Sequence, residues 1–370
     1  MSTTNRLVSL DIFRGMTIAF MILVNTPGSW TYVYAPLRHA AWDGCTPTDL
    51  VFPFFLFIVG VSMYLAFSKF NHQLTPEAIR KIGKRTLIIF LIGLALNWFP
   101  FYNKSFEELR IMGVLQRIAL AYGFGALICL SINRRNVLYV GGGMLLLYWA
   151  LMWFLGGDPK LGLETNFQRQ LDLLLLGENH LYKGYTNAAG EKVAFDPEGI
   201  LSTLSSIVTV MFGYWVGSLI KTMKNRDLLI KNLLIFGVIG ILMGWAWDKF
   251  FPINKPIWSS SYVLYTAGMA TVGLALCIEF IDLRGKNLLN TPFLVFGMNS
   301  LFSYVLSGLF VKVSFLINIG DQNLYAWLYS SIFQPTLGDF NGSLIFAITY
   351  VGLIWLCSLV LYRRQIFIKI

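Results

Sequence analysis

A short polar segment between two long apolar runs carries the residues best suited to chemistry. It covers residues 25–49, NTPGSWTYVYAPLRHAAWDGCTPTD, with Asn25 at one end, Asp49 at the other and His39 between them. A histidine titrates near neutral pH, so His39 can act as a general base or acid, and a carboxylate such as Asp49 can fix its tautomer. Asp49 could instead cap the following helix, near Thr46 and Thr48, and His39 could be a solvated loop residue. We predict an active-site loop centred on His39.

Two other chemistries are less favoured in this loop. No second histidine lies within ligand-like spacing of His39, so no metal is predicted. Cys45 is the one cysteine in a polar loop, because the other three lie inside apolar runs, and neither a disulfide nor a thiolate metal site is indicated. As a nucleophile, Cys45 would need its pKa lowered by a neighbour such as His39.

Composition identifies the elements that must position this loop. The 370 residues are 56% hydrophobic and 13% charged, whereas roughly 25% charged residues is usual in soluble proteins. Apolar runs of about 20 residues are long enough to cross a bilayer as helices. We predict an all-α polytopic membrane protein, with one transmembrane domain over residues 1–370 and about ten spans. They fall near 8–27, 49–68, 84–100, 112–132, 136–155, 199–220, 230–250, 258–280, 291–316 and 343–362. The segment Leu324–Phe333 is too short to span and is predicted to be interfacial or re-entrant.

The distribution of charge predicts an orientation. Lys and Arg gather after the second, fourth, sixth and eighth spans and at the C-terminus, while the opposite loops hold most of the acids. The positive-inside rule then places both termini in the cytoplasm and the His39 loop outside. The longest loop, 156–198, is also outside and is predicted to be a cap over an external opening, with a disordered connector as the alternative. The net charge of +10 is explained by these loops, so no nucleic-acid partner is expected. Because charged residues interrupt the first apolar run, no cleavable signal is predicted.

Several polar residues lie inside the predicted spans, where charge is costly and each such residue is a functional candidate. Arg14 follows Asp11 by three residues and could pair with it, and interhelical hydrogen bonding is the alternative for the others. Guanidinium groups match phosphate oxygens, so a polar cavity entered from the cytoplasm is predicted to bind phosphates. Its candidate residues are Arg14, Gln116 and Arg117, with Lys84 and Arg85 at the rim.

Two external segments form a second candidate set. DPEGILSTLSS precedes the sixth span, where its acids could simply cap a helix, and FPINKPIWSSSYV precedes the eighth. An aromatic ring beside hydrogen-bonding side chains suits a sugar, although interfacial anchoring of tryptophan is the alternative. The candidate acceptor-binding residues are Asp196, Glu198, Asn254, Lys255, Trp258, Ser259 and, from the ninth span, Asn299.

Six segments of the chain form a recognisable set: LDIFRGMTIAFMILVN, HAAWDGCTPTDLVFPFFLFIVG, GVLQRIALAY, DPEGILSTLSSIV, NKPIWSSSYV and TPFLVFGMNS. Together, in this order, they resemble the heparan-alpha-glucosaminide N-acetyltransferase family, including its bacterial homologues, and the resemblance extends from about Leu7 to the last span. The family's catalytic histidine lies in an H-A-x-W-[ND]-G motif that matches His39, and its polar partners match Asn25 and Asp49. Residue 43 is Asp where the motif of the lysosomal enzyme has Asn.

The resemblance implies transfer of acetyl from cytosolic acetyl-CoA to the amine of a glucosamine-type sugar across the membrane. We therefore expect a transmembrane N-acetyltransferase of the bacterial cytoplasmic (inner) membrane, with acetyl-CoA as co-substrate, no metal, and a homodimer as a further expectation. The family's large N-terminal lumenal region and the span before it are not expected here, so the acceptor need not be heparan sulfate. His39 could be the base or could carry the acetyl group covalently. An O-acetyltransferase of envelope polysaccharide, a sugar transporter or glycolipid flippase, and a membrane scaffold are the alternatives.

Overall fold

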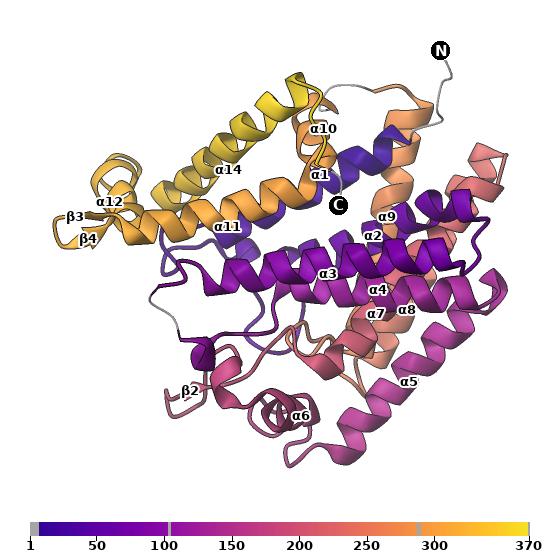
Figure 1. The fold of residues 1–370 in the computed structure, drawn as a ribbon, viewed down its shortest axis with the longest axis horizontal. Helices are drawn as coiled ribbons and strands as arrows, with labels where there is room; N and C mark the ends of the chain where they lie inside the picture. The colour runs from indigo at the N-terminus through magenta and orange to yellow at the C-terminus, as the bar shows by residue number, and fades with distance from the viewer. Residues whose placement is uncertain (1–6, 103–104, 287–289, 369–370) are drawn as a thin grey trace. The chain divides into compact units, whose positions relative to one another are not determined.

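The computed structural model describes residues 7–102, 105–286 and 290–368, most of them in helices (Figure 1). The chain divides into two compact units. Unit 1 comprises residues 1–40, 45–55 and 273–369, and unit 2 comprises 41–44 and 56–272. The division falls inside two helices, α2 (Val51–Phe67) and α9 (Ser260–Cys277).

Unit 1 is built around α1 (Val8–Asn25), which packs on α10 (Asn290–Met298), α11 (Ser300–Leu316) and α14 (Asp339–Arg363). Between α11 and α14 lie a two-residue hairpin, β3 (Asn318–Ile319) with β4 (Gln322–Asn323), and the short helices α12 (Leu324–Leu328), η8 (Tyr329–Phe333) and α13 (Gln334–Leu337). The His39 loop adds two single turns, η1 (Ala35–Leu37) and η2 (Pro47–Leu50). The π-helical turn η7 (Ile278–Leu283) extends α9.

The contact between α1 and α10 depends on two glycines. A Cβ atom at Gly15 would lie 1.7 Å from the Phe293 carbonyl oxygen, and one at Gly297 would lie 2.0 Å from the Asp11 carbonyl oxygen. Small residues let helix backbones approach closely in membranes, where packing replaces the hydrophobic effect as the driving force. The sequence therefore allows these two helices to touch along their backbones.

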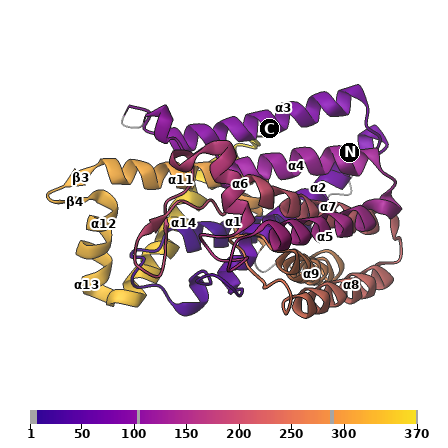
Figure 2. The same ribbon diagram turned by 90° about the horizontal axis from the view of Figure 1, so that it is seen from below.

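Unit 2 is organised around α7 (Ile200–Thr222), the most buried of its long helices. Helices α4 (Val114–Ser131), α5 (Val137–Leu155) and α6 (Phe167–Leu176) pack on α7, and α3 (Pro76–Trp98) runs beside α4 in both views (Figures 1 and 2). Helix α8 (Arg226–Trp247) lies against α9, where a Cβ atom added to Gly240 would lie 3.1 Å from the Gly268 Cα.

The predicted all-α polytopic fold is confirmed. The predicted span 291–316 is divided between α10 and α11, and each of the other predicted spans lies mainly on one long helix. Among the described residues, eight helices are long and apolar enough to cross a membrane, and α10 with α11 would make a ninth, bent by 84°. Helix α3 falls outside this set because its first turns carry Lys81, Lys84 and Arg85. The segment Leu324–Phe333 is α12 with η8 and is also too short to span.

The long loop after α5 is folded in the described structure. It contains α6, the turn η6 (Glu178–His180) and a hairpin of β1 (Tyr185–Thr186) with β2 (Lys192–Val193). Phe195 and Val193 join a buried cluster with Tyr148 and Met152 of α5 and with Phe251. The loop thus shares a core with the helices, which disfavours the disordered connector, and its role as a cap remains a prediction.

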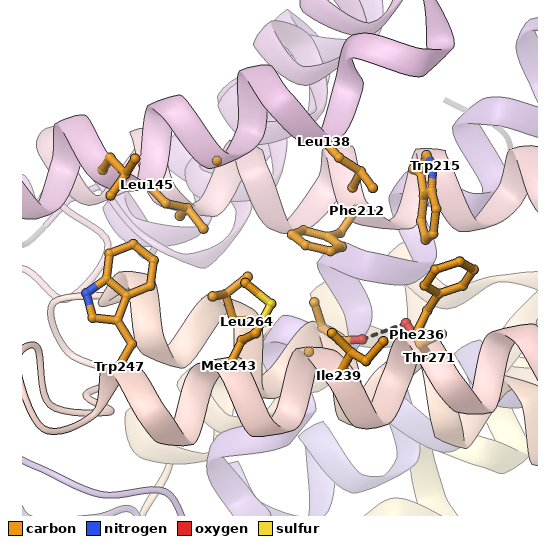
Figure 3. Close-up of a pocket in the computed structure, with 15 residues that line it drawn as sticks. Leu138, Leu145, Phe212, Trp215, Phe236, Ile239, Met243, Trp247, Leu264 and Thr271 are labelled. Atoms are coloured by element: carbon orange, nitrogen blue, oxygen red, sulfur yellow. Dashed lines mark hydrogen bonds between the residues drawn. The ribbon is translucent and has the colours of Figure 1, made fainter.

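An apolar pocket of about 400 Å³ lies between α5, α7, α8 and α9 (Figure 3). Leu138, Phe212, Met243 and Leu264 are among its walls, and the Thr271 hydroxyl donates to the Ala267 carbonyl within its own helix, 2.7 Å away. None of the described residues that line it is charged. The pocket therefore offers no general base or acid for group transfer.

The glycine contact gives a direct test of the packing of unit 1. We expect Gly15→Ala to destabilise the protein by about 1–3 kcal/mol, because the added methyl must displace the backbone of α10. The matched control is Gly352→Ala on α14, where nothing would lie within 4 Å of an added Cβ atom and alanine should be neutral or slightly stabilising in a helix. Thermal unfolding in detergent measures both, and equal midpoints would contradict the contact.

Candidate functional site

His39 is paired with a buried carboxylate. Its Nδ1 atom lies 2.6 Å from Asp49 Oδ1, and the Asp49 side chain is 1% exposed whereas that of His39 is 41% exposed. An ionised carboxylate only accepts hydrogen bonds, so the proton is assigned to Nδ1 and the lone pair of the neutral ring to Nε2. The contact with Asp49 therefore orients the His39 ring and places a proton on Nδ1.

The rest of the loop holds Asp49 in place. Its Oδ2 atom accepts hydrogen bonds from the amides of Ala40 and Thr46, each at 3.0 Å, and lies 2.9 Å from the Thr46 hydroxyl. That hydroxyl also lies 2.7 Å from the Arg38 carbonyl oxygen, and its single proton can serve one of them at a time. Asp49 thus caps η2 and binds His39 at once, so the two roles considered for it are compatible.

The segment before His39 is fixed by Arg38, whose guanidinium donates to the carbonyl oxygens of Val33 at 2.7 Å and Thr31 at 3.2 Å. Arg38 therefore shapes the loop through backbone contacts. Asn25 is the last residue of α1, and its side chain is exposed.

In unit 2, the residues directly after His39 in the chain are bound to the turn before α9. Gly44 N donates to the Ile253 carbonyl oxygen at 2.7 Å, and Asn254 Nδ2 donates to Asp43 Oδ1 at 3.1 Å. Asn254 also caps the turn, because its Oδ1 accepts from Ile257 N at 2.9 Å and its own amide donates to Ser259 Oγ at 3.0 Å. The predicted acceptor residues Asn254 and Ser259 are therefore buried members of a turn.

Trp258 ends this turn in a left-handed conformation, with φ of 49°. Such a conformation is unusual for a bulky residue and is maintained only when the surroundings impose it. Trp258 is 1% exposed, its indole donates to Thr209 Oγ1 at 3.2 Å, and the Arg117 guanidinium carbon lies 5.2 Å from its ring centroid. Lys255 is half-buried in the same turn.

Arg117 is fully buried on α4. Its Nη2 atom donates to the Gly199 carbonyl oxygen at 3.0 Å and to Ser202 Oγ, both at the start of α7. Its Nε and Nη1 atoms have no hydrogen-bond partner among the described residues, and the same holds for Nε2 of Gln116. Gln116 faces Gly93 of α3, so the structure brings Arg117 to Trp258 while Gln116 lies on another side of α4.

Arg110 forms an ion-pair cluster with two acids of this unit. It binds Asp196 through two hydrogen bonds of 2.7 and 2.8 Å and Glu198 through one of 2.6 Å. Burial alone would lower the pKa of Arg110, but the carboxylates of Asp196 and Glu198 more than offset it, so its pKa lies above the ordinary value. The two acids predicted to bind the acceptor thus hold the segment before α4 to the segment before α7.

Asp172 of α6 is a buried acid beside this cluster. Its Oδ1 atom accepts from Ile200 N at 2.9 Å, while its Oδ2 atom has no hydrogen-bond partner among the described residues. Burial raises the pKa of Asp172 to about 7, and the nearby Asp196 carboxylate adds to the shift. Gly199 leaves the space for this carboxylate, since a Cβ there would lie 1.9 Å from Oδ2.

The other predicted residues have different partners. In unit 1, Arg14 Nη1 binds Asp11 Oδ1 at 3.1 Å and the Gly297 carbonyl oxygen at 3.2 Å. In the same unit, the Asn299 amide bonds to the backbone of residues 366 and 368. On α3 of unit 2, Lys84 is exposed and Arg85 stacks over the Tyr122 ring, 4.6 Å from its centroid.

Two residues of this region did not appear among the predicted site residues. Arg110 lies just before the GVLQR motif, and Asp172 lies in QRQLDLLLLG, where a single acid interrupts a leucine run. An ionisable residue within an apolar run is a recognisable signal, and it marks Asp172. Arg110 gives no such signal, because its partners Asp196 and Glu198 lie more than eighty positions later and no motif links them to it.

The fold and the geometry of the His39 loop together define a class of protein. It is an all-helical integral membrane protein whose polar loop holds a histidine oriented by a buried aspartate. Residues 6–170 match the family model described as heparan-alpha-glucosaminide N-acetyltransferase, catalytic. The chain belongs to the heparan-alpha-glucosaminide N-acetyltransferase family, a family of acyltransferases.

Two relatives carry this name. The protein of Homo sapiens is 31% identical over 351 residues, which cover 81% of this chain and 52% of that protein. The protein of Mus musculus is 30% identical over 356 residues, which cover 82% of this chain and 53% of that protein. The chain thus spans about half the length of the curated relatives it matches.

The raised pKa of Asp172 predicts a pH-dependent stability. Between about pH 4 and pH 7 the folded protein holds a proton that the unfolded chain has lost, so stability falls as pH rises through this window. Asp172→Asn should remove this loss and gain up to about 4 kcal/mol over the parent at pH 8. Unfolding midpoints in detergent at several pH values check this, with exposed Glu178→Gln as control. Parallel pH profiles for the parent and Asp172→Asn would contradict the buried, protonated carboxyl.

Proposed function

We propose that this protein is a transmembrane N-acetyltransferase that moves acetyl from acetyl-CoA to the amine of an amino sugar. The observation that carries the proposal is the 2.6 Å contact between His39 and the buried Asp49. The relatives named as N-acetyltransferases supply the reaction class. A base of this kind is what acyl transfer to an amine requires, since the attacking nitrogen must lose a proton.

The proposed chemistry uses each loop residue in one role. The amine nitrogen attacks the thioester carbonyl, the C–S bond breaks, and CoA leaves as the thiolate. His39 Nε2 accepts the proton that the amine nitrogen loses, and Asp49 stabilises the imidazolium that results. Asn25 is proposed to donate a hydrogen bond to the oxyanion of the tetrahedral intermediate, a role that its exposed amide permits.

The donor is proposed to bind through basic side chains. Lys84 and Arg85 lie near the charged beginning of α3, and the guanidinium of Arg85 is held over Tyr122. Arg117 supports the same proposal, since its Nε and Nη1 groups can still donate to an acyl or phosphate oxygen. Gln116 of the same unit is a further proposed donor-binding residue, and the sequence alone adds Arg14 to the proposal.

The proposed setting is the bacterial cytoplasmic membrane, with both termini inside and the His39 loop outside. The support is the charge pattern: the turns after α2, α4 and α7 are basic, and the 156–198 loop carries most of the external acids. A homodimer is proposed only by analogy with the family.

Transfer of label across the membrane tests the role of His39. Proteoliposomes receive labelled acetyl-CoA on one side and glucosamine on the other, and His39→Ala should lower the rate by roughly 10²–10⁴-fold. Asp49→Asn should also lower the rate, because the asparagine amide can donate to Nδ1 and so leave the ring proton on Nε2, where it blocks proton acceptance. His180→Gln is the matched control, since the glutamine amide can still donate to the Leu109 carbonyl that His180 contacts at 2.7 Å.

Parental rates for His39→Ala would refute the assignment of the base. An ester product in place of an amide would show that the protein is an O-acetyltransferase and not an N-acetyltransferase. Uptake of the sugar without any need for acetyl-CoA would favour a transporter. A burst of labelled protein before product forms would instead assign His39 as a covalent acetyl carrier.

Cysteine labelling tests the orientation. Lys183→Cys, in the 156–198 loop, should react with a membrane-impermeant maleimide on intact cells, whereas Lys224→Cys, after α7, should react only once the membrane is permeabilised. Lys183 is exposed and Lys224 lies among exposed residues of its turn, so a difference in labelling reports the side of the membrane. The parent with its four native cysteines gives the background, and the reverse pattern would invert the topology.

A further inference from the structure

A groove with a mixed polar and apolar lining lies in unit 2, formed by the residues just after His39 and by the 156–198 loop. It has a volume of about 380 Å³, within the range of small-molecule sites. Its walls are Ala41 and Trp42, the segment from Pro159 to Thr165, and the strand and turn that begin at Tyr185. Ala41 is two residues from His39 along the chain.

One wall of the groove is aromatic and held rigidly. The Trp42 indole donates to the Leu161 carbonyl oxygen at 3.0 Å, and its ring packs edge-on against Phe195 and Tyr185, at centroid distances of 5.4 and 6.2 Å. Phe195 is completely buried, so Trp42 rests on the core while remaining partly exposed. A fixed aromatic ring of this kind binds the C–H face of a sugar with little loss of conformational entropy.

The other wall presents hydrogen-bonding groups. Asn187 Nδ2 donates to Glu164 Oε1 at 2.9 Å and to Glu191 Oε2 at 3.0 Å. Its Oδ1 atom accepts from the amides of Ala189 and Glu191, so Asn187 fixes the turn of the hairpin. Thr186 is exposed beside it, and the Thr165 hydroxyl donates to the Pro159 carbonyl oxygen. These groups are oriented before any ligand arrives.

The groove carries negative charge. Glu164 is the one charged side chain among the described lining residues, and Glu191 adds a second carboxylate through Asn187. Carboxylates accept hydrogen bonds from hydroxyl and ammonium groups and repel sulfate and phosphate groups.

We propose that this groove binds the acceptor as a neutral or cationic amino sugar and discriminates against sulfated sugars. The proposal rests on the proposed function for the identity of the acceptor class. It also moves the proposed acceptor site, because Trp258, Asn254 and Ser259 are buried in the turn before α9. That turn holds Asp43 and Gly44, which follow Trp42 in the chain. The groove, by contrast, is open and combines an aromatic ring with hydrogen-bonding groups.

A matched pair of variants tests the location. Ala188 lines the groove and Ala189 does not, although both belong to the same turn. Ala188→Trp should fill the groove and raise both the Kd for glucosamine, measured by calorimetry on the purified protein, and the KM for glucosamine by at least tenfold. The KM for acetyl-CoA should stay unchanged, and Ala189→Trp should behave like the parent in both measurements.

The Kd and the KM for glucosamine test the groove and the proposed function separately. Parent protein that binds glucosamine at this turn but transfers no acetyl would overturn the proposed function and leave the groove standing. Acetyl transfer with the same glucosamine KM in Ala188→Trp and the parent would overturn the groove alone. Failure of the parent to bind glucosamine at millimolar concentrations would also overturn the groove.

The charge selectivity has its own test. The parent should favour glucosamine over glucosamine 6-sulfate in kcat/KM, and Glu164→Gln should reduce that preference by about fivefold, the size typical of an exposed charge interaction. The glutamine side chain keeps an acceptor oxygen for Asn187, so the hairpin should remain folded. Equal kcat/KM values for the two sugars in the parent would refute the selectivity.

Discussion

The cost of removing charge from water determines how this protein places its ionisable groups. A carboxylate or guanidinium in an apolar interior is tolerated only when its hydrogen bonds are replaced. Asp49 meets this requirement with bonds to two backbone amides and a contact to His39, and Asp196 meets it through Arg110. Because those partners come from different segments of each unit, satisfying the charges also fixes the loops. The orientation of His39 is a by-product of keeping Asp49 buried.

Two buried ionisable groups lack part of the hydrogen bonds that would replace those to water. Arg117 keeps two donor atoms, and Asp172 one acceptor atom, without partners among the described residues. Asp172 adapts by holding its proton near neutral pH, whereas a guanidinium loses its proton far less readily. The buried region between α4, α6 and α7 is therefore less fully satisfied than the loop around Asp49. Incompletely bonded ionisable groups of this kind are common at functional sites, where they lower the stability of the fold.

The sequence predicted the helices well because their signal is local. A run of about 20 apolar residues identifies a helix without knowledge of its neighbours. Helix α3 is marginal because its charges lie in its own first turns, whereas the break between α10 and α11 was not foreseen. The His39 loop was recognisable for the same reason, since its reactive residues lie within one short segment. Its partners within the loop, Ala40 and Thr46, were near enough in sequence for a capping role to be foreseen for Asp49.

Long-range partners were not predictable in this way. Trp258 and Asn254 are residue types typical of a sugar site, and only the three-dimensional packing shows that they are buried in a turn. The groove beside Trp42 joins residues 41 and 42 to residues more than a hundred positions later, and no periodicity or motif links such segments. The pairing of Arg110 with Asp196 and Glu198 is of the same type.

The bend between α10 and α11 has a practical consequence. Residue Asn299 sits at this 84° break, and its side chain bonds to the backbone at Ile366 and Ile368. The final residues of the described chain therefore hold the side chain of a residue at a helix break that lies more than sixty positions earlier. An affinity tag or protease site attached directly after them would exert its strain on that break, so a purification handle there needs a flexible spacer.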